Sequence, residues 1–145
     1  VLEKRRRYVN FFENDPNLHL VKDVEEIIKY FFEKGITLIL ASSSAMVNID
    51  RVFNRFGLNK YFKAKISGAD LTASKPHPEI FEKAAILANI PKENCVVIED
   101  SDNGVKAAND ATIFVFGFAN PLSEGQTLKN ADFIINNFKR LKKLI

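Results

Sequence analysis

Two adjacent carboxylates follow a short apolar run near the middle of the chain. Residues 95–98 read Cys-Val-Val-Ile, which is typical of a strand buried on both faces, and Glu99 and Asp100 come directly after it. Ser101 and the two polar residues after it can cap a helix, and a helical pattern begins at Val105. In an open parallel sheet, ligands bind beyond the carboxyl ends of the strands. The two acids therefore predict a metal site at such an edge.

Three consecutive serines, Ser42, Ser43 and Ser44, follow another apolar run at residues 36–41. After them an amphipathic helical pattern runs to Gly57. Backbone N–H groups at the start of a helix favour an anion, and a hydroxyl beside them can donate to a phosphate oxygen. Serines in this place also act as ordinary helix N-caps. The pattern alone leaves phosphate binding and capping open.

Lys75 lies in a Ser-Lys-Pro-His-Pro segment. Pro76 favours an extended conformation at Lys75, and Pro78 suits the first turn of the helix that follows. A lysine held ahead of a helix can neutralise a carboxylate or a phosphate, although a lysine considered alone is more often simply exposed. His77 and His19 have no partner His or Cys at the spacing of metal ligands, so neither is assigned a role.

Helical and strand patterns alternate along the chain. The clearest helix runs from residue 24 to Phe32; Asp23 and Glu26 resemble a capping box at its start, and Gly35 supplies its end. Further strands are predicted at residues 36–41, 64–67, 112–116 and 132–135. This alternation predicts an α/β fold, a three-layer doubly wound arrangement with a mostly parallel sheet and helices on both faces.

The composition is that of one globular domain. The chain has 145 residues, 46% of them hydrophobic, which is enough for a buried core. Its net charge of +3 comes mostly from basic runs near the two ends, and no aromatic or glycine-rich pattern interleaves them, which argues against a nucleic-acid partner. No apolar run reaches the ~18 residues of a membrane span. The single cysteine, Cys95, lies in an apolar strand, which favours packing over chemistry and fits a reducing, cytoplasmic location.

Three segments together resemble a known family. They read Leu-Ala-Ser-Ser-Ser at residues 40–44, Ala-Ser-Lys-Pro-His-Pro-Glu-Ile-Phe at residues 73–81, and Ile-Glu-Asp-Ser-Asp-Asn-Gly-Val-Lys-Ala-Ala at residues 98–108. In order and spacing they resemble motifs of the haloacid dehalogenase (HAD) superfamily. The most similar branch is the group of β-phosphoglucomutases and sugar-phosphate phosphatases. The resemblance covers the chain from about residue 18 to its end.

The resemblance implies a role for each matching residue. Ser42 matches the serine that hydrogen-bonds the transferring phosphoryl group, with the backbone N–H of Ser43 beside it, and Lys75 matches the lysine that neutralises the phosphate and steadies the nucleophile. Glu99 and Asp100 match the acids that hold Mg²⁺, a hard cation that prefers oxygen ligands. The implied reaction is in-line attack by an aspartate on a phosphomonoester, giving an aspartyl-phosphate that water or a second hydroxyl accepts. The implied partner is a small phosphorylated metabolite such as a sugar phosphate.

The chain departs from the family pattern at the nucleophile. The family carries it in a first motif, Asp-x-Asp-Gly-[Thr/Val], on a central strand between the serine strand and the acid-pair strand. The only Asp-x-Asp here, at residues 100–102, precedes Asn-Gly and comes after Ser42 and Lys75, the reverse of the family order. We therefore expect residues before Val1 in the native protein to carry the first strand and most of a helical cap. Without that strand the sheet would contain a gap with two unpaired edges.

These inferences predict both the domain organisation and the function. Residues 1–15 are expected to form the last helix of the cap, and residues 16–145 the α/β core. The expected function is that of a Mg²⁺-dependent phosphomonoester hydrolase or phosphomutase, a monomer or weak dimer, with this chain inactive on its own. The alternative is a catalytically silent HAD-like domain that binds an anion or a partner. A response-regulator receiver is disfavoured, because in that fold the acid pair lies on the first strand.

Overall fold

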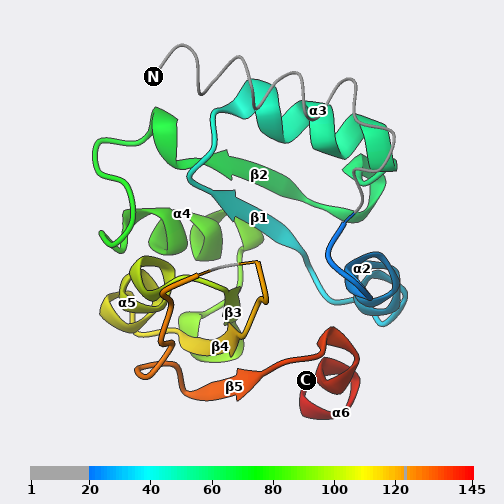
Figure 1. The fold of residues 1–145 in the computed structure, drawn as a ribbon. Helices are drawn as coiled ribbons and strands as arrows, with labels where there is room; N and C mark the ends of the chain where they lie inside the picture. Colours follow the sequence, from blue (N-terminus) through cyan, green and yellow to red (C-terminus); the bar gives the residue numbers. More distant parts are fainter. Residues whose placement is uncertain (1–19, 123) are drawn as a thin grey trace.

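The computed structural model describes residues 20–122 and 124–145 (Figure 1). The helix expected over residues 1–14 lies outside the described residues, and so does the expected boundary at residue 15 between a cap helix and the core. Helices and short strands alternate along the described part, as the apolar patterns predict. None of the helices in this part is long and apolar enough to cross a membrane.

The strands of the described residues form two parallel sheets. β1 pairs with β2, while β3, β4 and β5 lie side by side in that order. Ser42 is the last residue of β1 and Glu99 the last residue of β3, so both lie at the carboxyl ends of parallel strands. The strands are β1 (Ile39–Ser42), β2 (Ala64–Ser67), β3 (Val96–Glu99), β4 (Phe114–Phe118) and β5 (Phe133–Ile135).

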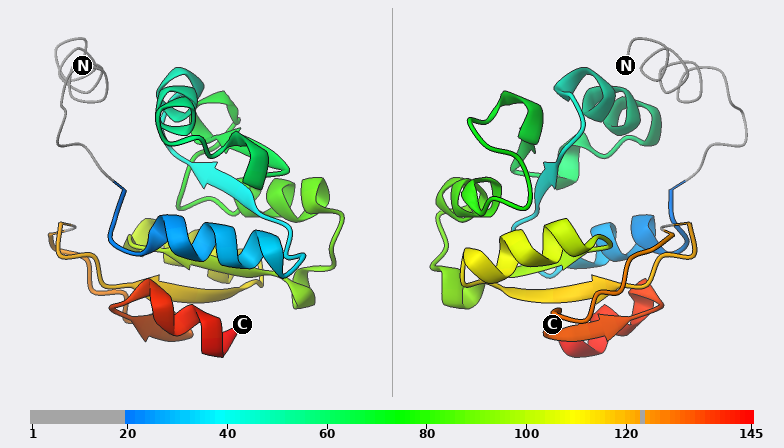
Figure 2. Two further views of the ribbon diagram at one scale, coloured as in Figure 1. Left: turned by 90° about the vertical axis from the view of Figure 1, so that its right-hand side faces the viewer. Right: turned by 60° about the vertical axis from the view of Figure 1, so that its left-hand side comes forward.

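Helices cover both faces of the strands (Figures 1 and 2). α4 and α5 pack on one face and enclose the largest buried apolar cluster. α2 and α6 pack on the other face, and α3 joins that side through a smaller cluster. The three layers confirm the predicted α/β fold. The helices are α2 (Val24–Glu33), α3 (Met46–Phe56), α4 (Glu79–Ala88), α5 (Asp102–Asp110) and α6 (Leu141–Leu144).

The start of α2 differs from the predicted capping box. Asp23 has a left-handed backbone with φ of 70°, and its side chain accepts no capping hydrogen bond. It therefore lacks the extended N-cap conformation that directs a side chain to the first free N–H groups, and its carboxylate lies 3.8 Å from Lys139 Nζ instead. The apolar face stabilises the helix: Ile27 and Phe31 are each 3% exposed, and burial of each contributes roughly 1.5–3 kcal/mol. Gly35, with φ of 78°, follows the end of the helix as predicted.

Two strands begin later than their apolar runs predict. β1 covers residues 39–42 rather than 36–41, and β4 begins at Phe114 rather than Thr112. Thr112 has φ of 60°, and its N–H donates to the backbone oxygen of Asn109 at 3.0 Å. It belongs to the turn after α5, because a left-handed residue cannot continue a strand.

β1 and β3 face each other without pairing. Each is the edge of its own sheet, and a cavity lies between them, lined by Leu40 and Ser42 from β1 and by Ile98 and Glu99 from β3. The strands on both sides run in parallel registers to their carboxyl ends. This is the position at which the family resemblance places a further strand.

Candidate active site

The three serines form a tight turn between β1 and α3. The hydroxyl of Ser42 accepts a hydrogen bond from the backbone N–H of Ser44 at 3.1 Å. The backbone oxygen of Ser44 in turn accepts from the hydroxyl of Ser67, which is 2% exposed, at 2.6 Å. Ala45 occupies the N-cap position of α3 and makes no side-chain capping bond. Since no serine side chain caps this helix, the capping interpretation of these serines is wrong.

Lys75 connects the two sheets. Its ammonium group donates to the backbone oxygen of Ala41 in β1 at 3.1 Å and forms an ion pair with Oε1 of Glu99 in β3. Both charged side chains are 9% exposed, and the ammonium group also lies 5.1 Å from the ring centroid of Phe81. Lys75 therefore lies in the site and is not simply exposed.

The loop that carries Lys75 is closed by hydrogen bonds between its own ends. The carboxylate of Glu79 accepts from the backbone N–H of Ala73 at 3.1 Å, and the N–H of Glu79 donates to Nδ1 of His77 at 3.1 Å. The N–H of His77 donates to the backbone oxygen of Ser74 at 3.0 Å. His77 is therefore part of the loop structure.

Both carboxylate oxygens of Glu99 have protein donors. Oε1 accepts from Lys75, and Oε2 accepts from the hydroxyl of Ser101 at 3.2 Å. That hydroxyl also accepts a hydrogen bond from the backbone N–H of Gly104 at 3.0 Å. Ser101 is therefore the N-cap of α5, and it is one of the three residues predicted to cap this helix. Glu99 is oriented towards Lys75 and the start of α5.

Asp100 is held by a residue that the sequence patterns did not assign to the site. Its Oδ2 accepts from the side-chain amide of Asn120 at 3.1 Å. Asn120 follows β4, and in the sequence the Asn-Pro pair predicts only a loop. A contact across 20 positions between a loop and a strand end leaves no periodic signal, so sequence reasoning could not find it.

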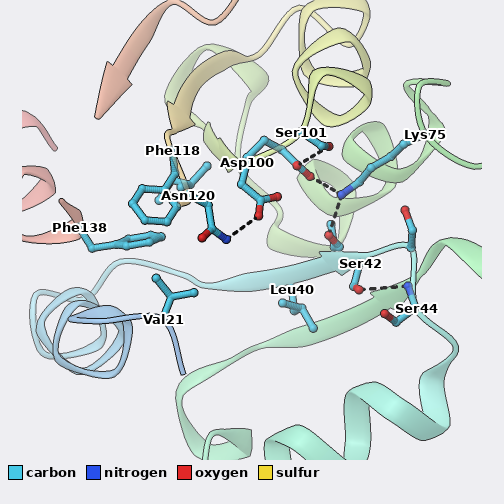
Figure 3. A pocket seen from close by; sticks show the side chains of 14 residues that line it. Val21, Leu40, Ser42, Ser44, Lys75, Asp100, Ser101, Phe118, Asn120 and Phe138 are labelled. Atoms are coloured by element: carbon cyan, nitrogen blue, oxygen red, sulfur yellow. Dashed lines mark hydrogen bonds and ion pairs between the residues drawn. The ribbon is translucent and has the colours of Figure 1, made fainter. Parts of the chain in front are cut away.

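All five predicted site residues line one cavity of about 410 Å³ (Figure 3). Ser42, Ser43, Lys75, Glu99 and Asp100 converge there from the ends of β1 and β3 and from the loop before α4. The remainder of the lining includes apolar residues, namely Val21, Leu40, Ile98, Phe118 and Phe138. The cavity thus combines a polar region at the strand ends with an apolar region between the strands.

A second cavity of about 350 Å³ shares Ser43, Lys75 and Ser101 with the first. Asp102, on its wall, accepts from the backbone N–H groups of Thr127 at 3.1 Å and Leu128 at 2.7 Å. These bonds, led by that of Thr127, hold the pKa of Asp102 below its usual range, since they stabilise the ionised carboxylate. The loop between β4 and β5 is thereby attached to the start of α5.

The carboxylates in the cavity provide the type of ligand that Mg²⁺ requires. The described residues contain no group of three or more His, Cys, Asp or Glu side chains that could hold a metal. Mg²⁺ commonly takes only one or two carboxylates, with waters and substrate phosphate oxygens filling the other positions. Asp100 lines the cavity with carboxylate oxygens, and Lys75 lines the same cavity. The carboxylate oxygens of this cavity are of the type that a magnesium ion accepts.

Comparison with known proteins identifies the family. Residues 2–112 match the model of the haloacid dehalogenase-like hydrolases. A phosphorylated carbohydrates phosphatase of Thermotoga maritima is 32% identical over 130 residues, which are 89% of this chain and 57% of that protein. The β-phosphoglucomutase of Bacillus subtilis is 28% identical over 132 residues, 91% of this chain and 56% of that protein. The chain thus spans little more than half the length of either relative.

Solved structures agree with this assignment. The crystal structure of a putative β-phosphoglucomutase from Thermotoga maritima superposes with a TM-score of 0.81 at 29% identity, over 99% of this chain and 67% of that one. The fold, the motif residues gathered in one cavity and the match to the family model agree with one another. The chain belongs to the haloacid dehalogenase-like hydrolase family.

Proposed function

We propose that the native protein is a Mg²⁺-dependent phosphatase or phosphomutase that acts on a small sugar phosphate. The observation that carries the proposal is the convergence of Ser42, Ser43, Lys75 and Asp100 on one cavity at the carboxyl ends of β1 and β3. A hydroxyl, a cation and a carboxylate are the groups needed to hold a phosphoryl group and a divalent ion together. Relatives named as a carbohydrate-phosphate phosphatase and a β-phosphoglucomutase support the same substrate class.

The residues of the cavity have separate tasks in this proposal. Ser42 donates its hydroxyl hydrogen to a phosphoryl oxygen, and the N–H of Ser43 donates to another. Lys75 neutralises the phosphate, and its ion pair with Glu99 fixes the position of its ammonium group. Because these donors are held before the substrate arrives, little reorganisation is needed as charge develops on the phosphoryl oxygens.

Asp100, with Glu99 beside it, would hold the metal. A bound Mg²⁺ supplies positive charge to the phosphoryl oxygens. Both oxygens of Glu99 also accept hydrogen bonds, from Lys75 and from Ser101. Glu99 therefore also orients Lys75.

The nucleophile in this proposal is an aspartate on a strand that residues 20–122 and 124–145 do not supply. The supporting observation is the cavity between β1 and β3, whose facing edges are not paired with each other. Its apolar lining, which includes Leu40, Ile98 and Phe118, suits a buried strand better than a phosphate. Such a strand can come from the same native protein or from a neighbouring copy.

A hydrolysis screen on the protein expressed from its complete reading frame tests the proposal. We expect release of phosphate from one or more sugar phosphates with Mg²⁺, and its loss with a chelator. Ser42→Ala should lower kcat by about 10²- to 10³-fold, because a preorganised donor is lost. Ser74→Ala is the matched control, since Ser74 is an exposed serine next to Lys75 and should leave kcat unchanged.

Two results would contradict the proposal. One is full activity in the presence of the chelator, which excludes a role for Mg²⁺. The other is phosphate binding without turnover of any sugar phosphate, which supports the alternative, a catalytically silent anion-binding domain.

A further inference from the structure

The side-chain amide of Asn120 has a defined orientation. Its Oδ1 accepts from the backbone N–H of Leu122 at 3.0 Å, and its Nδ2 donates to Oδ2 of Asp100 at 3.1 Å. An amide group has one accepting end and one donating end, and the backbone N–H of Leu122 can only donate. The oxygen must therefore face Leu122, so the NH₂ group must face Asp100.

The backbone around Asn120 is held as well. Its own N–H donates to the backbone oxygen of Phe118, the last residue of β4, at 2.9 Å. Further along the same loop, the N–H groups of Thr127 and Leu128 donate to the carboxylate of Asp102. The loop between β4 and β5 is thus attached at two points to the segment that contains Asp100. Figure 3 shows Asn120 and Asp100 side by side at the cavity wall.

We infer that Asn120 is a positioning residue for the metal-binding carboxylate of Asp100. The inference rests on the proposed function, because it concerns the same metal site. A hydrogen-bond donor on Oδ2 fixes the rotation of the Asp100 carboxylate. The side chain therefore loses less conformational freedom when Mg²⁺ binds. Residues that orient a metal ligand in this way typically change metal affinity by about 10- to 100-fold when they are removed.

The test measures the Mg²⁺ dissociation constant of the protein expressed from its complete reading frame, by calorimetry without substrate. Asn120→Ala removes the donor, and we expect Mg²⁺ to bind about 10- to 100-fold more weakly. Leu122→Ala is the matched control: this side chain on the same loop is 86% exposed, and the backbone N–H that orients Asn120 remains. Its dissociation constant should equal that of the wild type.

Activity and stability measurements separate positioning from damage to the fold. Excess Mg²⁺ should restore kcat in Asn120→Ala, and the metal-free melting temperature should match that of Leu122→Ala. An unchanged Mg²⁺ dissociation constant in Asn120→Ala would overturn the inference alone and leave the proposed function intact. A lower kcat that excess Mg²⁺ cannot restore, together with a lower metal-free melting temperature, would also overturn it. A wild-type protein that binds no Mg²⁺, either alone or with inorganic phosphate present, would overturn both the inference and the proposed function.

Discussion

The carboxylate of Glu99 occupies the space that a side chain at position 104 would need. A Cβ atom on Gly104 would lie 2.0 Å from Cδ of Glu99, 2.1 Å from its Oε2 and 2.6 Å from its Cγ. Glu99 cannot simply move away, because Lys75 and Ser101 hold its two oxygens. Gly104 is therefore required for the close approach of the acid to the first turn of α5.

Gly104→Ala should displace Glu99 from Lys75. We expect the free energy of unfolding to fall by about 1–3 kcal/mol, the usual cost of overpacking a buried position. Phosphate binding should weaken as well, because Lys75 loses its partner. Urea unfolding and phosphate titration measure the two effects. Lys106→Ala on an exposed position of the same helix is the control and should change stability by less than about 0.5 kcal/mol; equal losses in both variants would contradict the explanation.

The ion pair between Lys75 and Glu99 predicts a coupled pair of substitutions. Lys75→Met leaves a carboxylate that is 9% exposed without its cation, and Glu99→Gln leaves the ammonium group without its anion. Each single change should cost about 3 kcal/mol of unfolding free energy. The double variant should cost less than the sum of the two, with a coupling of about 0.5–3 kcal/mol in urea unfolding. Additive losses would show that the two groups do not interact.

Glu79 closes the loop that carries Lys75 by accepting from the N–H of Ala73. Glu79→Ala should cost about 1–3 kcal/mol, because a backbone donor loses a charged acceptor, and it should weaken phosphate binding. Glu82→Ala is the matched control: Glu82 shares the first turn of α4, and its 3.9 Å contact with Lys92 is exposed. Both variants remove the same favourable charge at the helix start, so the difference between them isolates the loop bond. Equal phosphate affinities would argue against a role for Glu79.

Cys95 should titrate at a higher pH in the folded protein than in the unfolded chain. Burial, and to a lesser extent the charge of Glu93, raise the pKa of its thiol. The folded state thus favours the neutral thiol. The stabilisation that comes from keeping this thiol neutral is complete below the unfolded pKa of about 8.5, and it is lost as the pH rises through the folded pKa. Alkylation rates measured from pH 7 to 10, native and in urea, should give a midpoint at higher pH for the native protein. A native midpoint at or below the unfolded one would contradict this.

Much of the fold follows from patterns that are local in the sequence. The helical spacing of Ile27 and Phe31 predicts α2, because a helix that buries one face needs apolar residues at that spacing. The continuous apolar run before Glu99 predicts β3, because a strand buried on both faces is apolar throughout. Two of the errors occur where backbone dihedrals override the pattern. Asp23 and Thr112 are both left-handed, which removed a predicted cap and delayed a predicted strand.

The sequence by itself determined the fold class and predicted residues that the structure brings to one cavity. Ser42, Lys75 and Asp100 stand at strand ends or before a helix, positions that local patterns identify, and parallel strands bring such ends to one edge. Only the tertiary structure decided which contacts these groups make. In the folded protein, both oxygens of Glu99 accept hydrogen bonds and Gly104 lies against that acid. The amide of Asn120 donates to Asp100. These contacts join residues through side-chain directions and loop paths, which depend on how the layers pack and not on any periodic feature of the chain.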